Sequence, residues 1–99
     1  IAEKAFRNDK NLKRVVIGSN VKKIGKQAFE KCKKLSSVTF KGKKAPTIGK
    51  TAFKGIKKKT SVQVTGSMKK SQVKRLQKRM KTAAPSVKIT YKKKITVRF

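Results

Sequence analysis

The chain contains no histidine, one cysteine and only three acidic residues among its 99 residues. Without histidine it has no His-based triad, no histidine general base and no histidine metal ligand. The carboxylates, Glu3, Asp9 and Glu30, follow no repeated spacing, which argues against paired-carboxylate hydrolysis and against a carboxylate-rich metal site. No glycine-rich phosphate-binding motif is present. We therefore predict no catalytic, cofactor-binding or metal-binding residue, no cofactor and no enzyme activity.

The single cysteine and the absence of long apolar runs exclude further features. Cys32 cannot form an intramolecular disulfide; it is interpreted as a core residue, and the alternative is a reactive thiol or an intermolecular link. No run approaches the ~20 apolar residues of a membrane span. No signal peptide stands at the start, and Ile1 lies in the middle of a sequence repeat. We therefore expect a C-terminal piece of a longer protein with its export signal upstream.

Five apolar positions recur three times along the first two thirds of the chain. Phe6 and Phe29 are 23 residues apart (29 − 6), and Phe29 and Phe53 are 24 apart (53 − 29). A period in this range with fixed apolar positions is the signature of stacked repeats. The recurring sets are Ile1/Ile24/Ile48, Ala5/Ala28/Ala52, Phe6/Phe29/Phe53, Val15/Val38/Val62 and Ile17/Phe40/Val64.

These repeats predict an α/β fold. The alternation of Val38 and Phe40 places both side chains on one face of a short strand, and equivalent strands of neighbouring repeats should pair in parallel. One repeat cannot bury its apolar face, whereas stacked repeats can. We predict a short solenoid of three repeats of 23–24 residues, at about residues 1–23, 24–47 and 48–66. Its expected core positions are Ile24, Ala28, Phe29, Cys32, Leu35, Val38, Phe40, Ile48, Ala52 and Phe53, and Phe6 is expected in the core with them.

The frame I-G-x-x-A-F-x-x-C-x-x-L-x-x-V-x-F between Ile24 and Phe40 resembles the BspA-like leucine-rich repeat family. The resemblance covers about Ile1 to Val64. The residues of the second repeat that carry it are Ile24, Gly25, Ala28, Phe29, Cys32, Leu35, Val38 and Phe40. It implies a non-catalytic interaction or adhesion module that is secreted or attached to the surface of a bacterium. It also implies a basic helix after the last repeat.

Residues 67–99 are predicted to form a C-terminal cap. Val73, Leu76 and Met80 are spaced as one apolar face of a helix over about residues 68–81, with Ser67 as its N-cap. This face would cover the last repeat; the alternative is a basic helix lying on a membrane surface. Alternating apolar residues then predict strands over about 87–91 and 95–99.

The net charge of +28 has two interpretations. One is a surface that binds polyanions, and the other is a solvated surface that reflects composition alone. The expected partners are a protein, a glycan or an anionic cell-wall polymer, and the alternative function is non-specific binding of DNA or RNA through charge alone. Tyr91 is a possible base-stacking residue. The densest ordered basic segment, and therefore the candidate polyanion-binding set, is Lys69, Lys70, Lys74, Arg75, Lys78 and Arg79.

Overall fold

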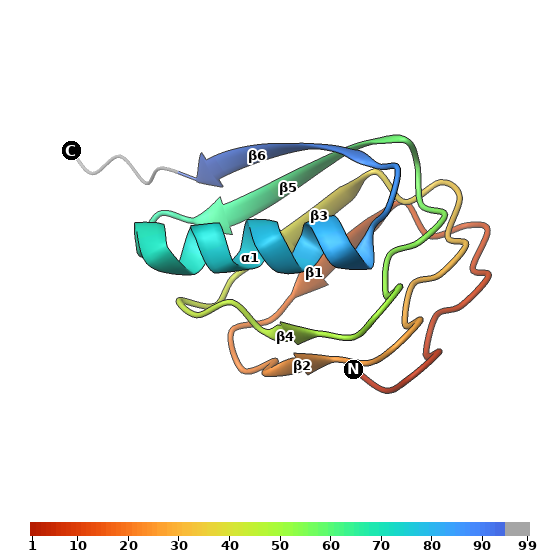
Figure 1. The fold of residues 1–99 in the computed structure, drawn as a ribbon, viewed down its shortest axis with the longest axis horizontal. Helices are drawn as coiled ribbons and strands as arrows, with labels where there is room; N and C mark the ends of the chain where they lie inside the picture. The colour runs from red at the N-terminus through yellow and green to blue at the C-terminus, as the bar shows by residue number, and fades with distance from the viewer. Residues whose placement is uncertain (95–99) are drawn as a thin grey trace.

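The computed structural model describes residues 1–94 of the chain. Within them the elements follow in the order β1 (Arg14–Ile17), β2 (Lys23–Ile24), β3 (Ser37–Phe40), β4 (Thr47–Ile48), β5 (Lys59–Thr65), α1 (Lys70–Ala83) and β6 (Lys88–Lys94). The strands form a four-stranded parallel sheet in the order β1-β3-β5-β6 and a two-stranded parallel sheet of β2 and β4 (Figure 1). Val15 is paired with Val38, and Val38 with Val62, so the predicted parallel register of the repeats is found.

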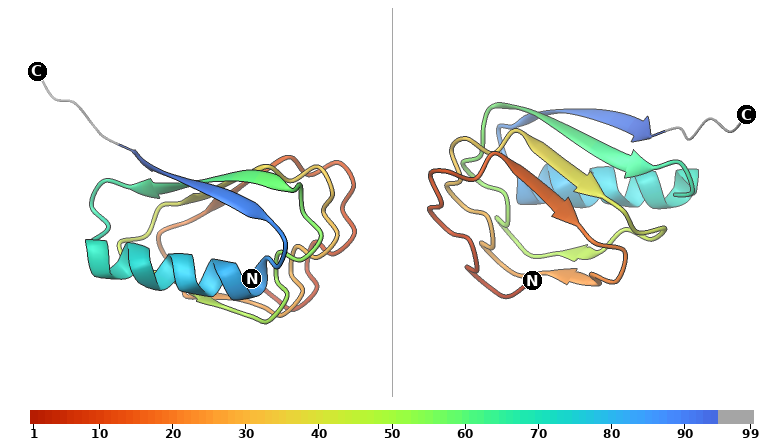
Figure 2. Two further views of the ribbon diagram at one scale, coloured as in Figure 1. Left: turned by 45° about the horizontal axis from the view of Figure 1, so that its top comes forward. Right: turned by 180° about the vertical axis from the view of Figure 1, so that it is seen from behind.

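The three repeats lie side by side and follow nearly the same path (Figure 2). Their Ala-Phe turns are joined by backbone hydrogen bonds: Phe6 N donates to Ala28 O at 2.8 Å, and Phe29 N donates to Ala52 O at 2.7 Å. Backbone angles repeat as well, because Lys4, Gln27 and Thr51 occupy one repeat position and all have φ of 58°. This conformation is unfavourable for a β-branched residue such as Thr51. The repeat geometry, and not the local residue, therefore sets the backbone there.

The core lies between the two sheets and the Ala-Phe turns. The rings of Phe6, Phe29 and Phe53 are stacked, with centroids 5.3 and 5.1 Å apart and interplanar angles of 4° and 9°. Phe29 and Phe53 are buried, but Phe6 is 44% exposed, so the expectation of a core Phe6 is wrong. Phe6 has a stacked neighbour on one side only. Of the ten residues expected in the core, all are buried except Ile48, which is half-buried.

Helix α1 packs beside the third repeat through Leu76, Met80 and Ala83, which are buried. Phe53 N donates to Ala83 O at 2.9 Å, so Ala83 and the buried Ala84 take the Ala-Phe position of a further repeat. The helix begins two residues after the predicted Met68 and ends two residues after Lys81. Ser67 is not the N-cap: that position is held by Lys69, which makes no side-chain capping hydrogen bond.

Strand β6 continues to Lys94, past the predicted strand end at Tyr91. It pairs in parallel with β5, from Lys59 opposite Lys88 to Thr65 opposite Lys94. Backbone pairing along an existing strand does not depend on side-chain polarity, which is why a lysine run continues the strand. The second predicted strand, residues 95–99, lies outside the described residues.

Candidate functional site

The basic side chains are almost all on the surface. Among residues 1–93, every lysine and arginine is exposed except Arg79, which is half-buried. Positive charge therefore covers most of the surface. What distinguishes a candidate site is a group of basic side chains that line one hollow or edge and are held there by hydrogen bonds. Three groups stand out: a hollow beside α1, a hollow beside the loops that follow β1 and β3, and an edge formed by the turns before the long strands.

The first group surrounds a hollow of about 580 Å³ between α1 and β4, here called the helix hollow. Lys74, Arg75, Lys78 and Arg79 line it because residues four apart on a helix share a face. Ile48 of β4 and Thr82 of α1 complete the lining. The structure thus brings together four of the six predicted polyanion-binding residues, while Lys69 precedes the helix and Lys70 begins it, and neither lines this hollow.

Arg79 is fixed by contacts that the sequence did not reveal. Its Nη1 donates to Ala45 O at 3.0 Å and to Pro46 O at 2.9 Å, across more than 30 positions of sequence. Gln72 Oε1 accepts from Ala45 N at 3.0 Å, so two side chains of α1 hold the same loop. A guanidinium carries five N–H donors, and these bonds use only the Nη1 group. Arg79, held in this way, lines the helix hollow.

The second hollow, here called the loop hollow, has a volume of about 670 Å³. Four lysines contribute to it from the loops after β1 and β3, and Ala45 and Pro46 form part of its apolar wall. These lysines were not predicted from the sequence, because they are far from the helix along the chain and only the fold brings them near it. Besides Ala45 and Pro46, the residues that line the loop hollow are Ser19, Val21, Lys22, Lys41, Lys43 and Lys44.

The third group is a basic edge at the turns before β1, β3, β5 and β6. Backbone bonds hold these turns together: Ser36 N donates to Lys13 O, Lys57 N to Leu35 O, and Lys88 N to Lys58 O at 2.7 Å. Lys33 and Lys57 occupy the same repeat position, so like charges stand next to one another along this edge. The exposed lysines of this edge are Lys10, Lys13, Lys33, Lys34, Lys57, Lys58, Lys59 and Lys88.

A family model described as the BspA type leucine rich repeat region, in six copies, matches residues 1–95. The chain belongs to the BspA-type leucine-rich repeat family. The match extends about 30 residues beyond Val64, where the sequence analysis placed the end of the resemblance, and so includes α1 and β6. No curated protein and no solved structure matches the chain.

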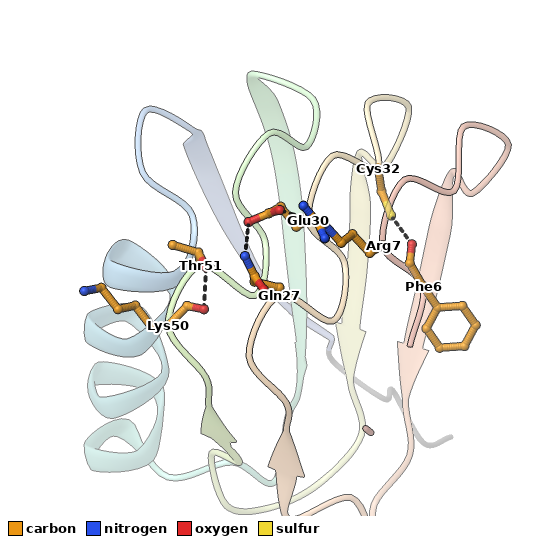
Figure 3. Close-up of polar contacts among 7 residues, drawn as sticks. All are labelled: Phe6, Arg7, Gln27, Glu30, Cys32, Lys50 and Thr51. Atoms are coloured by element: carbon orange, nitrogen blue, oxygen red, sulfur yellow. Dashed lines mark hydrogen bonds and ion pairs between the residues drawn. The ribbon is translucent and has the colours of Figure 1, made fainter. Parts of the chain in front are cut away.

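The acidic side chains of this BspA-type chain lie apart from both hollows. The buried Glu30 accepts a hydrogen bond from Arg7 Nε at 3.0 Å, which joins the first two repeats, and another from Gln27 Nε2 at 3.1 Å within the second repeat (Figure 3). Burial by itself would raise the pKa of Glu30, but the Gln27 amide and the Arg7 guanidinium lower it below its ordinary value. Glu30 is therefore charged at neutral pH and is occupied in holding the repeats together.

Cys32 packs in the core between the first two repeats. The buried thiol donates to Phe6 O at 3.1 Å, and burial raises the pKa of Cys32 (Figure 3). A raised pKa disfavours the reactive thiolate, which supports the packing interpretation. Within the described residues no group of His, Cys, Asp and Glu could hold a metal ion. The described helix α1 is too short and too polar to cross a membrane.

Proposed function

We propose that this BspA-type chain is a short solenoid that acts as a non-catalytic interaction module and binds linear anionic polymers at a bacterial cell surface. The observation that carries the proposal is the helix hollow, where Lys74, Arg75 and Lys78 surround an arginine held by two backbone carbonyls. A surface of scattered lysines needs no such arrangement. The family supports the interaction role, because leucine-rich repeat domains generally mediate binding and are typically non-catalytic.

Binding should be driven mainly by release of counterions. Lysine is a compact point charge without fixed recognition geometry, so affinity should follow the charge density of the polymer. The chain has 31 basic and three acidic residues, which leaves its surface attractive to any polyanion at low salt. A contribution of the helix hollow must therefore be separated from that of the overall charge.

The test compares two variants of equal charge. Replacing Lys74, Arg75 and Lys78 by Gln changes the helix hollow, whereas replacing Lys33, Lys34 and Lys57 by Gln changes the basic edge. Dissociation constants for a sulfated glycan, an anionic cell-wall polymer and duplex DNA are measured over a series of salt concentrations. We expect the helix variant to bind more weakly and to lose about 0.7–0.9 of salt slope per contact removed. Affinity of the parent that hardly changes with salt would contradict the electrostatic proposal.

A second candidate is a protein partner on the outer face of the four-stranded sheet. Val16, 59% exposed, lies beside Thr39, and Thr39 beside Gln63, so this face is largely polar and uncharged in its centre. Replacing Thr39 and Gln63 by Lys adds two positive charges, so it should not weaken polymer binding and should disrupt only a protein partner. The alternative of a dedicated nucleic-acid-binding protein is distinguished by competition, since preference for one DNA sequence over others would contradict the adhesion proposal.

A further inference from the structure

The helix hollow and the loop hollow adjoin one another. Ala45 and Pro46 line the loop hollow, and their carbonyl oxygens accept the two hydrogen bonds of Arg79, which lines the helix hollow. Ile48, two positions after Pro46, lies in the wall of the helix hollow. One arginine therefore stands at the boundary of both hollows and fixes their separation.

Eight cationic side chains line the combined surface, here called the basic track. Four lysines come from the loops after β1 and β3, and two lysines and two arginines come from α1. None of the three acidic side chains of the chain lines either hollow. Ser19 in the loop hollow and Thr82 in the helix hollow add neutral hydroxyl donors. The basic track consists of Lys22, Lys41, Lys43, Lys44, Lys74, Arg75, Lys78 and Arg79.

Aromatic side chains are missing from the track. Phe29, Phe40 and Phe53 are buried, Phe6 lies at the first repeat, and Tyr91 lines a separate hollow beside β6. Proteins that bind single-stranded nucleic acid combine a basic groove with aromatic rings on which bases stack. Of the described residues, those lining the track can hold anionic oxygens and include no aromatic ring on which a base could stack.

We propose that the basic track is one continuous site for a flexible, base-free linear polymer that carries repeated phosphate or sulfate groups. The inference rests on the proposed function and specifies its site and ligand class. Lysines and arginines of the two hollows bind successive tetrahedral oxyanions, and the hydrogen bonds of Arg79 keep the two halves at a fixed distance. Joining the two halves through one polymer makes the second contact intramolecular, so the affinities combine multiplicatively.

The test uses three pairs of substitutions that each remove two charges. Lys43 and Lys44 are replaced by Gln in the loop hollow, Lys74 and Lys78 in the helix hollow, and Lys57 and Lys58 at the basic edge as the matched control. The ligands are inorganic polyphosphate of defined length, dextran sulfate and oligothymidylate of matched charge. Thermal unfolding of each variant confirms that the fold is retained.

A continuous track predicts that the loop pair and the helix pair each lower polyphosphate affinity roughly tenfold at about 0.15 M salt, because two lost contacts remove about 1.4 from the salt slope. Replacing Lys57 and Lys58 at the basic edge should lower polyphosphate affinity far less. If the two hollows were independent sites, losing one would cost about twofold at most, and that result overturns the track while the proposed function stands. Absence of polyanion binding by the parent overturns the proposed function itself.

Comparing the three ligands tests which chemical groups of a polymer the basic track binds. A base-free site predicts that polyphosphate or dextran sulfate binds more tightly than oligothymidylate, and the tighter of the two identifies phosphate or sulfate as the group recognised. Oligothymidylate that binds most tightly of the three would show that bases contribute, and would overturn the base-free class.

Discussion

The two ends of the row of repeats differ although the same Ala-Phe motif defines both. At the first repeat Phe6 is 44% exposed and Ile1 is 36% exposed. At the other end Phe53 is fully buried, because α1 and the turn after it cover the third repeat. The motif therefore places a ring in a stack, but whether that ring becomes core depends on what packs on its second side.

The covered end also shows how a helix can replace part of a repeat. Phe6 N, Phe29 N and Phe53 N donate to successive alanine carbonyls at 2.8, 2.7 and 2.9 Å. The third of these carbonyls belongs to Ala83, the last residue of α1. Ala84 then stands where another phenylalanine would continue the ring stack, and it is 3% exposed. The backbone pattern thus continues by one repeat while the ring stack ends.

The largest change in stability is expected when single phenylalanines of the stack are replaced by alanine. Phe29→Ala removes a ring stacked on both sides, and we expect a loss of about 3–5 kcal/mol in the free energy of unfolding. Phe6→Ala removes a ring that is nearly half exposed, and its loss should be less than half as large. Denaturant unfolding of both variants measures the difference. Equal losses would mean that the first repeat is covered in solution.

Much of the repeat fold could be predicted from the sequence because its apolar residues recur at a fixed spacing. The positions of Phe29, Val38 and Phe40 recur in register, and because they lie in the middle repeat, neighbouring repeats bury them on both sides. The helix was predicted from Val73, Leu76 and Met80 for the same reason, although its start was misplaced. Lys69, not Ser67, precedes the first turn, because the buried Met68 and the turn at Thr65 hold that segment outside the helix.

The candidate site could be predicted only in part. The helical spacing of Lys74 and Lys78 was visible in the sequence, and these residues do share a hollow. The contribution of Lys43 and Lys44 was not visible, since it depends on Arg79 and Gln72 holding a loop about 30 positions away. Hydrogen bonds to backbone carbonyls leave no pattern in a sequence. The sequence therefore does not distinguish a fixed, half-buried arginine from an exposed basic side chain.

A smaller effect is expected from filling the space between two repeats. A Cβ at Gly49 would lie 2.6 Å from Lys26 Cα, so Gly49→Ala must push the second and third repeats apart. We expect a loss of about 1–3 kcal/mol, the usual cost of overpacking. Gly18→Ala is the control, because nothing lies within 4 Å of its Cβ position. Thermal unfolding that is alike for both variants would contradict the close approach of the repeats.

The smallest effect is a pH dependence at the end covered by α1, where the only tyrosine in the chain can be titrated. Tyr91 lines a hollow with Gln77 and Lys81 of α1, and burial raises the pKa of Tyr91 from 10.0 to about 12. Because the folded state favours the neutral phenol, its contribution to stability is present below pH 10 and is lost as the pH rises from 10 to about 12. The ultraviolet absorbance of tyrosinate follows the titration of Tyr91 directly. We expect the native chain to titrate near 12 and the chain in denaturant near 10, and a Leu76→Ala variant, which loosens α1, to fall between them. Titration of the native chain near 10 would mean that this end is as open as the end that carries Phe6.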